Sequence, residues 1–265
     1  YTPTIASFWP HPREVLYNET RLRLDLPEEK LPILEELGIE QLVLIPFDKK
    51  LSKLSAESFI QEVLINQLQA KNISVGANFR FGFKRSGDVN TIRDTLKDLD
   101  IKLKIISILN DQEGRISSSR VRDLLQKCDL KNASKMLNRP YSFSGHVVKG
   151  KGLGQNIGFP TANLEINGRK FLPGEGVYAA WTKIKNSNHQ IASIMNLGPQ
   201  PTINPLLPSA VEVHLINKNI NLYGLNLSVE PVTKLRSQIK FANLELLSQQ
   251  IAKDKESAVK ILNNP

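Results

Sequence analysis

One segment, residues 145–164 (GHVVKGKGLGQNIGFPTANL), combines glycines, a basic side chain and hard oxygen ligands. Its loop glycines are Gly150, Gly152, Gly154 and Gly158. Glycine lets consecutive backbone N–H groups turn toward one anion, and Lys151 adds positive charge there. Pro160 restricts the chain just before Thr161 and Asn163, whose hydroxyl and amide oxygens are ligands that Mg²⁺ accepts beside phosphates. The segment predicts a site for a nucleotide phosphate and its metal.

The same segment also fits a simple loop that ends in a turn, with Thr161 and Asn163 capping their own backbone. Residues 145–152 read GHVVKGKG, which nearly matches a P-loop. Glycine stands where the P-loop needs Ser or Thr for the metal, and the middle of the stretch has strand character, so the P-loop is excluded. The choice between a phosphate site and a plain loop depends on residues elsewhere.

Three groups of residues in the first half could also bind anions. His11 lies between two prolines, where it faces either a phosphate or solvent. The stretch 76–88 (GANFRFGFKRSGD) places Arg80 and Arg85 among phenylalanines and glycines, as in a loop that closes over an aromatic or anionic ligand. Residues 116–122 (ISSSRVR) enter a helix, whose free N–H groups and serines form an anion site. A plain serine cap is the alternative there.

The elements that must position these groups follow from apolar patterning. Residues 4–8, 41–45, 73–76 and 103–109 are predicted strands, and 28–37, 55–70 and 90–99 have helical spacing. Ser55 is the predicted N-cap of the second helix. Their alternation predicts an α/β fold with a parallel sheet, and a ligand crevice at the carboxyl ends of its strands.

Strand-like runs dominate after about residue 138. They cover residues 143–149, 176–184, 190–197, 210–216 and 225–232. Many short strands separated by turns predict an all-β part, a small antiparallel barrel. A final helix over 243–262 carries an apolar stripe that should pack on the barrel, formed by Leu244, Leu247, Ile251, Ala258 and Leu262. We therefore expect two domains, residues 1–138 and 139–265.

Composition limits the partners. No apolar run approaches a membrane span, no signal peptide is visible, and the single Cys128 excludes an internal disulfide and suits a reducing compartment. The net charge of +9 suits polyanions, but the basic residues are scattered and aromatics are only 6%. We expect small-molecule substrates, no nucleic acid, no membrane and a cytoplasmic location.

The first-half motifs FWPHPRE, GANFRFG and ISSSRVR resemble the adenylyltransferase half of the bacterial bifunctional riboflavin kinase/FAD synthetase family. The resemblance implies a Rossmann-like nucleotidyltransferase domain that uses ATP and FMN and yields FAD. The ATP- and FMN-binding residues that it implies are His11, Asn78, Arg80, Arg85, Ser117, Ser118, Ser119 and Arg122. Asn78 stands for the family's aspartate and Ser119 for its threonine.

The family's first strand leads into a G-x-F-D-G-x-H-x-G-H motif that these 265 residues do not contain. We therefore expect a partial adenylyltransferase domain, and a chain that forms FMN but little or no FAD.

Residues 140–263 resemble the riboflavin kinase domain of the same family, through the stretch 145–164 and through PGEGVYAA, NLGPQPTIN and VEVHL. The resemblance implies phosphorylation of riboflavin by MgATP. Thr161 and Asn163 would hold Mg²⁺, Glu212 would be the general base, and Arg236 would contact the flavin phosphate unless it is a plain surface arginine. The implied ATP-binding residues are Gly150, Lys151, Gly152, Gly154, Pro160, Thr161 and Asn163.

Strand alternation gives the role of Glu212 a physical basis. Glu212 and His214 should share one face of their strand, with apolar residues on the other. A carboxylate between valines favours a functional role, whereas an exposed charge on a solvated sheet is the alternative. His214 shares that alternative and receives no role. Two other functions stay open: a nucleotidyltransferase of another substrate with the barrel as specificity module, and a basic barrel for nucleic acid.

Overall fold

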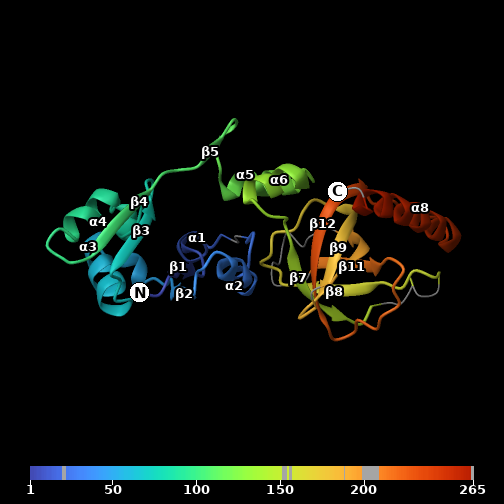
Figure 1. Cartoon of the computed structure of the whole chain (residues 1–265), viewed down its shortest axis with the longest axis horizontal. Helices are drawn as coiled ribbons and strands as arrows, with labels where there is room; N and C mark the ends of the chain where they lie inside the picture. Colours follow the sequence, from blue (N-terminus) through green and yellow to red (C-terminus); the bar gives the residue numbers. More distant parts are fainter. Residues whose placement is uncertain (20–21, 151–153, 155–156, 188, 199–208, 264–265) are drawn as a thin grey trace. The chain divides into compact units, whose positions relative to one another are not determined.

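The computed structural model describes residues 1–19, 22–150, 154, 157–187, 189–198 and 209–263. The chain forms two compact units (Figure 1). The first comprises Tyr1–Arg21 and Leu31–Ile116, and the second comprises Leu22–Lys30 and Ser117–Pro265. These units show which parts of the chain pack together, and their boundaries need not be domain boundaries. The expected domains, residues 1–138 and 139–265, stay a prediction.

The first unit is an α/β fold whose four longer strands pair in parallel, while its two short two-residue strands pair antiparallel. Its strands are β1 (Thr4–Trp9), β2 (Gln41–Pro46), β3 (Asn72–Gly76), β4 (Lys102–Ile106), β5 (Asn110–Asp111) and β6 (Gly114–Arg115). Its helices are α1 (Pro12–Tyr17), α2 (Pro27–Glu36, which begins in the second unit), η1 (Leu51–Lys53), α3 (Ala56–Ser58), η2 (Phe59–Gln67), η3 (Phe83–Arg85) and α4 (Val89–Thr95). β1 pairs with β2 and β3 with β4, both in parallel, as two separate two-stranded sheets rather than one continuous sheet. The predicted strand 103–109 ends at Ile106.

The core of the first unit lies around η2, which makes π-type hydrogen bonds and follows directly on α3. As predicted, Ser55 caps this helical stretch, its hydroxyl accepting from Ser58 N at 3.0 Å. Two phenylalanines of the stretch 76–88 belong to this core: Phe81 is 5% exposed and stacks on Phe79 with ring centroids 5.2 Å apart. A Cβ on Gly82 would lie 2.7 Å from the Cα of Ala56, so this stretch packs closely on α3.

The second unit contains a closed six-stranded barrel. Its strands are β7 (Phe143–Val148), β8 (Ala162–Ile166), β9 (Gly176–Ile184), β10 (Gln190–Leu197), β11 (Ser209–Leu215) and β12 (Asn226–Arg236). They pair antiparallel throughout, in the order β10-β11-β8-β7-β12-β9, and β9 closes on β10. The predicted antiparallel barrel is confirmed. The sequence analysis found five of these strands and missed β8, whose residues it assigned to the end of the phosphate segment.

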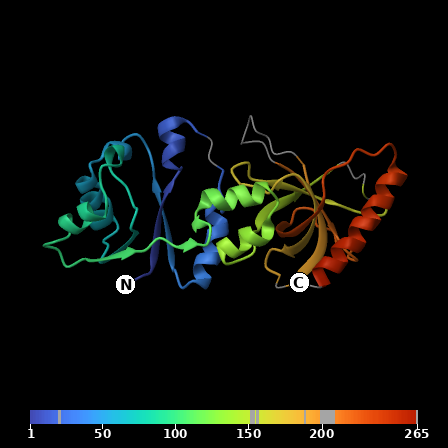
Figure 2. The ribbon, with the colours of Figure 1, turned by 90° about the horizontal axis from the view of Figure 1, so that it is seen from above.

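Among the described residues, the second unit also contains the helices α5 (Ser118–Gln126), α6 (Leu130–Leu137) and α8 (Leu244–Asn263). Helix α8 packs on β9, β10 and β12 through Ile251, Ala258 and Leu262, as its apolar stripe predicted. Figure 2 shows α8 along the barrel wall. Leu244, predicted to be part of that stripe, is 51% exposed. Among the described residues, no helix has both the length and the apolar character needed to cross a membrane.

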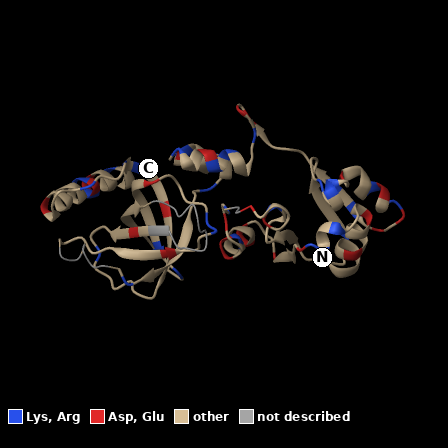
Figure 3. Cartoon of the chain, turned by 180° about the vertical axis from the view of Figure 1, so that it is seen from behind, with Lys and Arg blue, Asp and Glu red and all other residues tan. Residues whose placement is uncertain are grey.

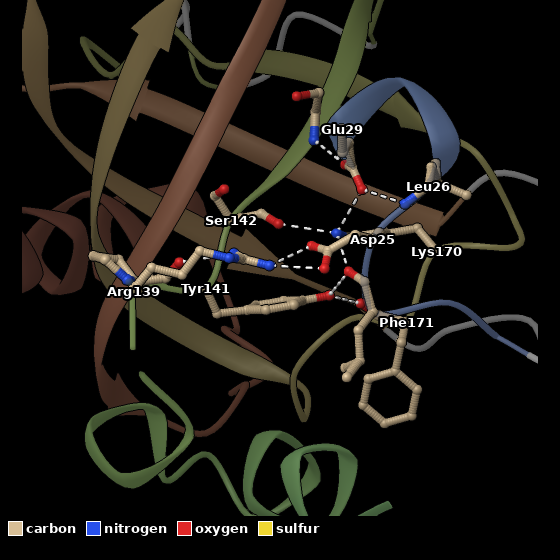
Figure 4. A network of polar contacts seen from close by, with 11 residues as sticks. Asp25, Leu26, Glu29, Arg139, Tyr141, Ser142, Lys170 and Phe171 are labelled. Atoms are coloured by element: carbon tan, nitrogen blue, oxygen red, sulfur yellow. Dashed lines mark hydrogen bonds and ion pairs between the residues drawn. The ribbon is translucent and has the colours of Figure 1, made fainter. Parts of the chain in front are cut away.

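A buried polar network ties the segment Leu22–Lys30 to the barrel (Figure 4). Lys170 is fully buried, and its Nζ lies 2.7 Å from Glu29 Oε2 and 2.9 Å from the Ser142 carbonyl. Arg139 Nη2 lies 2.7 Å from both carboxylate oxygens of Asp25. Burial lowers the pKa of Lys170, and the Glu29 carboxylate opposes that shift. The opposite charges therefore stabilise each other inside the unit.

Basic and acidic residues are intermixed along the chain. Lysine and arginine occur beside aspartate and glutamate on elements of both units (Figure 3).

Candidate active site

The candidate site of the barrel is built by the register of three neighbouring strands. Glu212 of β11 is the cross-strand partner of Asn163 on β8 and of Asn196 on β10. Partners directly opposite each other in an antiparallel sheet project to the same face, with Cβ atoms about 5 Å apart. Val211 and Val213 are buried in the core at 1% exposure each, whereas Glu212 is half-buried. The carboxylate and the two amides therefore share the face turned away from the core.

Two of the predicted glycines lie against the two predicted metal ligands. A Cβ on Gly150 would lie 1.9 Å from Asn163 Nδ2, so the backbone approaches this amide as closely as only glycine permits. A Cβ on Gly154 would lie 2.3 Å from the Phe159 carbonyl oxygen and 3.3 Å from Thr161 Oγ1. The glycines are thus needed for close approach to the residues around Thr161 and Asn163. Lys151 and Gly152 lie outside the described residues.

The donor chemistry of this face fits Mg²⁺. The candidate ligands are the Thr161 hydroxyl and the Asn163 amide oxygen, with the Glu212 carboxylate opposite Asn163. Within the described part of the chain, no group of three or more His, Cys, Asp or Glu residues could hold a metal. A hard cation here would therefore complete its shell with water and substrate phosphates, which is the mode of binding that Mg²⁺ favours.

His214 also belongs to this face, although the sequence analysis assigned it no role. It is 8% exposed, and its Nδ1 lies 2.8 Å from the Pro160 carbonyl oxygen. Its ring meets the Phe159 ring edge-on, with centroids 5.4 Å apart. The only sequence feature that pointed to a role for His214 was its position two residues after Glu212 on one strand. The Pro160 contact, across 54 residues of sequence, had no local signature.

Asn196 is a second site residue that the sequence analysis did not single out. Gln238 donates from Nε2 to Asn196 Oδ1 and to the Leu197 carbonyl, each at 3.1 Å. Because Oδ1 accepts from Gln238, the Asn196 amide group is held in one orientation at the strand position beside Glu212.

Arg236, the predicted flavin contact, ends β12 and is paired within the unit. Its Nε lies 3.0 Å from both carboxylate oxygens of Asp254, and its Nη2 lies 2.8 Å from Oδ2. Asp254 is only 4% exposed, so its buried carboxylate neutralises the charge of Arg236 within the unit. Its contact with a flavin phosphate stays a prediction.

The predicted adenylyltransferase residues of the first unit follow β1 and β3. His11 caps α1, with Nδ1 accepting from Arg13 N at 3.1 Å. Arg80 pairs with Asp88, the N-cap of α4, at 2.9 Å. With its amide oriented so that Oδ1 faces Arg115, Asn78 accepts from both terminal nitrogens of that arginine at 2.9 Å. Arg85 is exposed and has a φ of +61°.

The remaining predicted residues begin α5 in the second unit. Ser117 is the N-cap, and its hydroxyl accepts from Arg120 N at 3.4 Å. Ser118 and Ser119 are exposed in the first turn. Arg122 donates to the Ser118 carbonyl and to the Leu22 carbonyl, each at 3.1 Å. The eight predicted residues therefore divide between the two compact units, whereas Glu212 and Asn163 are cross-strand partners on one barrel face and Thr161 directly precedes β8.

Fold and site together define a protein class, in which a parallel α/β unit is combined with a closed barrel that carries acidic and hard-oxygen groups beside glycine-rich backbone. The family model for riboflavin kinase matches residues 137–262, and that for FAD synthetase matches residues 2–120.

Two relatives are named bifunctional riboflavin kinase/FMN adenylyltransferase. The protein of Haemophilus influenzae is 34% identical, across 98% of this chain and 84% of its own length. That of Bacillus subtilis is 33% identical, across 99% of this chain and 83% of its own length. A crystal structure described as a macrolide-efflux protein from Streptococcus pneumoniae covers 97% of this chain and 83% of its own, with 27% identity and a TM-score of 0.83. The chain belongs to the bifunctional riboflavin kinase/FMN adenylyltransferase family.

Proposed function

We propose that this chain transfers a phosphoryl group from MgATP to riboflavin on the barrel, yielding FMN and ADP. We propose FMN adenylyltransferase activity, which forms FAD from FMN and ATP, as the second activity. Family membership supports both activities. The single observation that carries the kinase assignment is the register of Glu212 with Asn163, which lies two residues after Thr161.

Each residue of the barrel face has a physical task in the transfer. The Glu212 carboxylate, half-buried beside two amides, accepts the proton of the riboflavin 5′-hydroxyl as that oxygen attacks. At Gly150 and Gly154 the backbone lies so close to Asn163 and to the residues beside Thr161 that a side chain would clash, and glycine lets such backbone turn its N–H groups toward a phosphate. Thr161 and Asn163 would hold Mg²⁺, which supplies charge neutralisation on the phosphate oxygens when bound.

Positioning is the main contribution of such a site, because phosphoryl transfer needs little covalent help from the protein. Strand register supplies that positioning, since it sets the distance between the base on β11 and Asn163 on β8 by backbone hydrogen bonds.

For the second activity, the N-terminus of α5 is the candidate phosphate-binding element. Ser117 caps it, and Ser118 and Ser119 expose hydroxyls in its first turn. Free N–H groups and the helix dipole favour an anion at that end.

Separation of flavins after incubation of the chain with riboflavin and MgATP tests both activities in one run. We expect FMN with an equal amount of ADP. Absence of FMN under conditions in which the protein is folded would refute the kinase assignment. The same run measures FAD, which the second proposed activity would form from the FMN produced. A parallel incubation with FMN and MgATP tests adenylyl transfer alone.

A further inference from the structure

We propose that His214 is a positioning residue of the kinase site, one that holds Phe159 and Pro160 so that Thr161 and Asn163 are presented beside Glu212. The inference rests on the proposed kinase function and extends it to a residue outside the predicted set. His214 lies on β11, on the same face as Glu212.

The contact occurs where the backbone pairing of β8 and β11 stops. The last cross-strand pair is Ala162 with Val213. Continued by one residue, the register would place Thr161 opposite His214. Pro160 has no N–H and cannot donate to a sheet ladder. At this position the imidazole, by contacting the Pro160 carbonyl at 2.8 Å, substitutes for the missing backbone pairing.

The chemistry of this contact fixes the protonation of the ring. A carbonyl oxygen only accepts, so the His214 Nδ1 that faces it must carry the proton. In the neutral ring, Nε2 is then the acceptor. The Phe159 ring, edge-on at 72°, buttresses the imidazole from a second side. Two consecutive residues, Phe159 and Pro160, are thus fixed directly before the candidate metal ligand Thr161.

The consequence for catalysis concerns the position of the Thr161 hydroxyl. Thr161 precedes the first paired residue of β8, so the ladder itself does not hold its hydroxyl. A displacement of about 1 Å in a positioned group can cost on the order of 100-fold in rate. Loss of the His214 contact should therefore act, through the position of Thr161, on turnover and on binding of the metal-bound nucleotide.

Two substitutions separate the hydrogen bond from the ring packing. His214→Phe keeps a ring against Phe159 but removes the donor. His214→Asn keeps a donor, because its amide nitrogen can take the place of Nδ1, but removes the ring. We expect kcat of His214→Phe to fall by about 10- to 100-fold, and its preference for MgADP over metal-free ADP, measured by calorimetry, to shrink. His214→Asn should recover most of both. His189→Ala, an exposed barrel histidine, is the matched control and should change neither.

The tautomer gives a readout that does not depend on activity. Nitrogen-15 NMR of the histidine-labelled wild type should show a proton on His214 Nδ1 at neutral pH, assigned by loss of its signals in His214→Asn. A neutral ring protonated only at Nε2 would overturn the proposal, and so would a folded His214→Phe with wild-type kcat and MgADP preference. Equal impairment of the Phe and Asn variants would also overturn it.

If His214→Phe fails to fold, the tautomer measured by NMR and the activity of His214→Asn decide whether His214 is a positioning residue. Absence of FMN formation by the wild type would instead refute the proposed kinase function, while the NMR result would still decide whether His214 holds Pro160.

Discussion

The barrel and the α/β unit solve the problem of unpaired strand edges differently. Each barrel strand has a neighbour on both sides, because β9 closes on β10. In the first unit, β1–β4 form two parallel pairs, in which each strand has a single neighbour. Closure removes edges outright, whereas a two-stranded sheet depends on packing from helices for its stability.

Burial follows the same division. Val211, Leu227 and Val229 of the barrel strands are at most 1% exposed. Ile5 of β1 is 40% exposed and Ile106 of β4 is 50% exposed. Apolar surface removed from water stabilises by about 25 cal/mol per Å², so the barrel draws more stabilisation from each strand than the α/β unit does.

The candidate sites differ in a related way. Backbone register holds the kinase set, since Asn163 and Asn196 flank Glu212 on adjacent strands. The adenylyltransferase set lies on loops and helix starts, where caps such as His11 and Ser117 satisfy local backbone groups. A site whose residues are fixed by strand pairing stays in place as long as the barrel is folded. A site whose residues lie on loops and helix caps also depends on how those loops are arranged.

The largest effect should come from removing Glu212, the proposed general base of the kinase site in the barrel. Glu212→Gln keeps the size of the side chain but cannot accept the 5′-hydroxyl proton. We expect kcat for FMN formation to fall about 10²- to 10⁴-fold, with riboflavin and MgADP binding retained in calorimetric titrations. Near-normal turnover would show that Glu212 is merely a solvated strand residue.

The next effect concerns the two oxygen ligands. Thr161→Val and Asn163→Leu remove the hydroxyl and the amide while keeping volume. We expect both to abolish measurable turnover and to weaken MgADP much more than metal-free ADP, because only the metal-bound form uses these oxygens. Equal weakening of the two nucleotide forms would indicate that the side chains only shape the glycine segment.

Stability of the second unit should depend on its buried network. Lys170→Met leaves Glu29 without its cation and strands the Ser142 carbonyl. Breaking a buried ion pair costs roughly 3–5 kcal/mol, so we expect a clearly lower urea concentration at the midpoint of unfolding. Lys127→Met, which breaks the exposed pair with Asp123, is the matched control and should leave the midpoint unchanged. Similar midpoints for the two variants would mean that the Lys170 network adds no stability.

The mildest test involves no substitution. If closure protects the barrel, amide hydrogen exchange should be slowest in β9 and β12 and faster in β1–β4, because local opening requires less loss of packing in a two-stranded sheet. Mass spectrometry of peptides from both units, after exchange at one pH, measures this directly. Equal protection in β1–β4 and in the barrel would remove the proposed difference.

Local patterns predicted much of this fold for physical reasons that can be named. Two-residue alternation correctly placed Val211 and Val213 inside and Glu212 outside. The Ser55 cap was predicted because a cap contacts backbone only a few residues away. The same alternation was present in β8, where Ala162, Leu164 and Ile166 are buried, but the adjacent proline and glycines favoured a loop interpretation.

By itself the sequence determined the residue types that can do the chemistry, the faces of individual strands and the family. Only the tertiary structure decided that Glu212 stands between Asn163 and Asn196, that His214 holds Pro160, and that Lys170 pairs with Glu29, which is 141 residues away. The physical reason is that register and buried ion pairs are set by non-local packing. Residues that are far apart in the chain meet only once the barrel closes, and no spacing along the chain encodes that meeting.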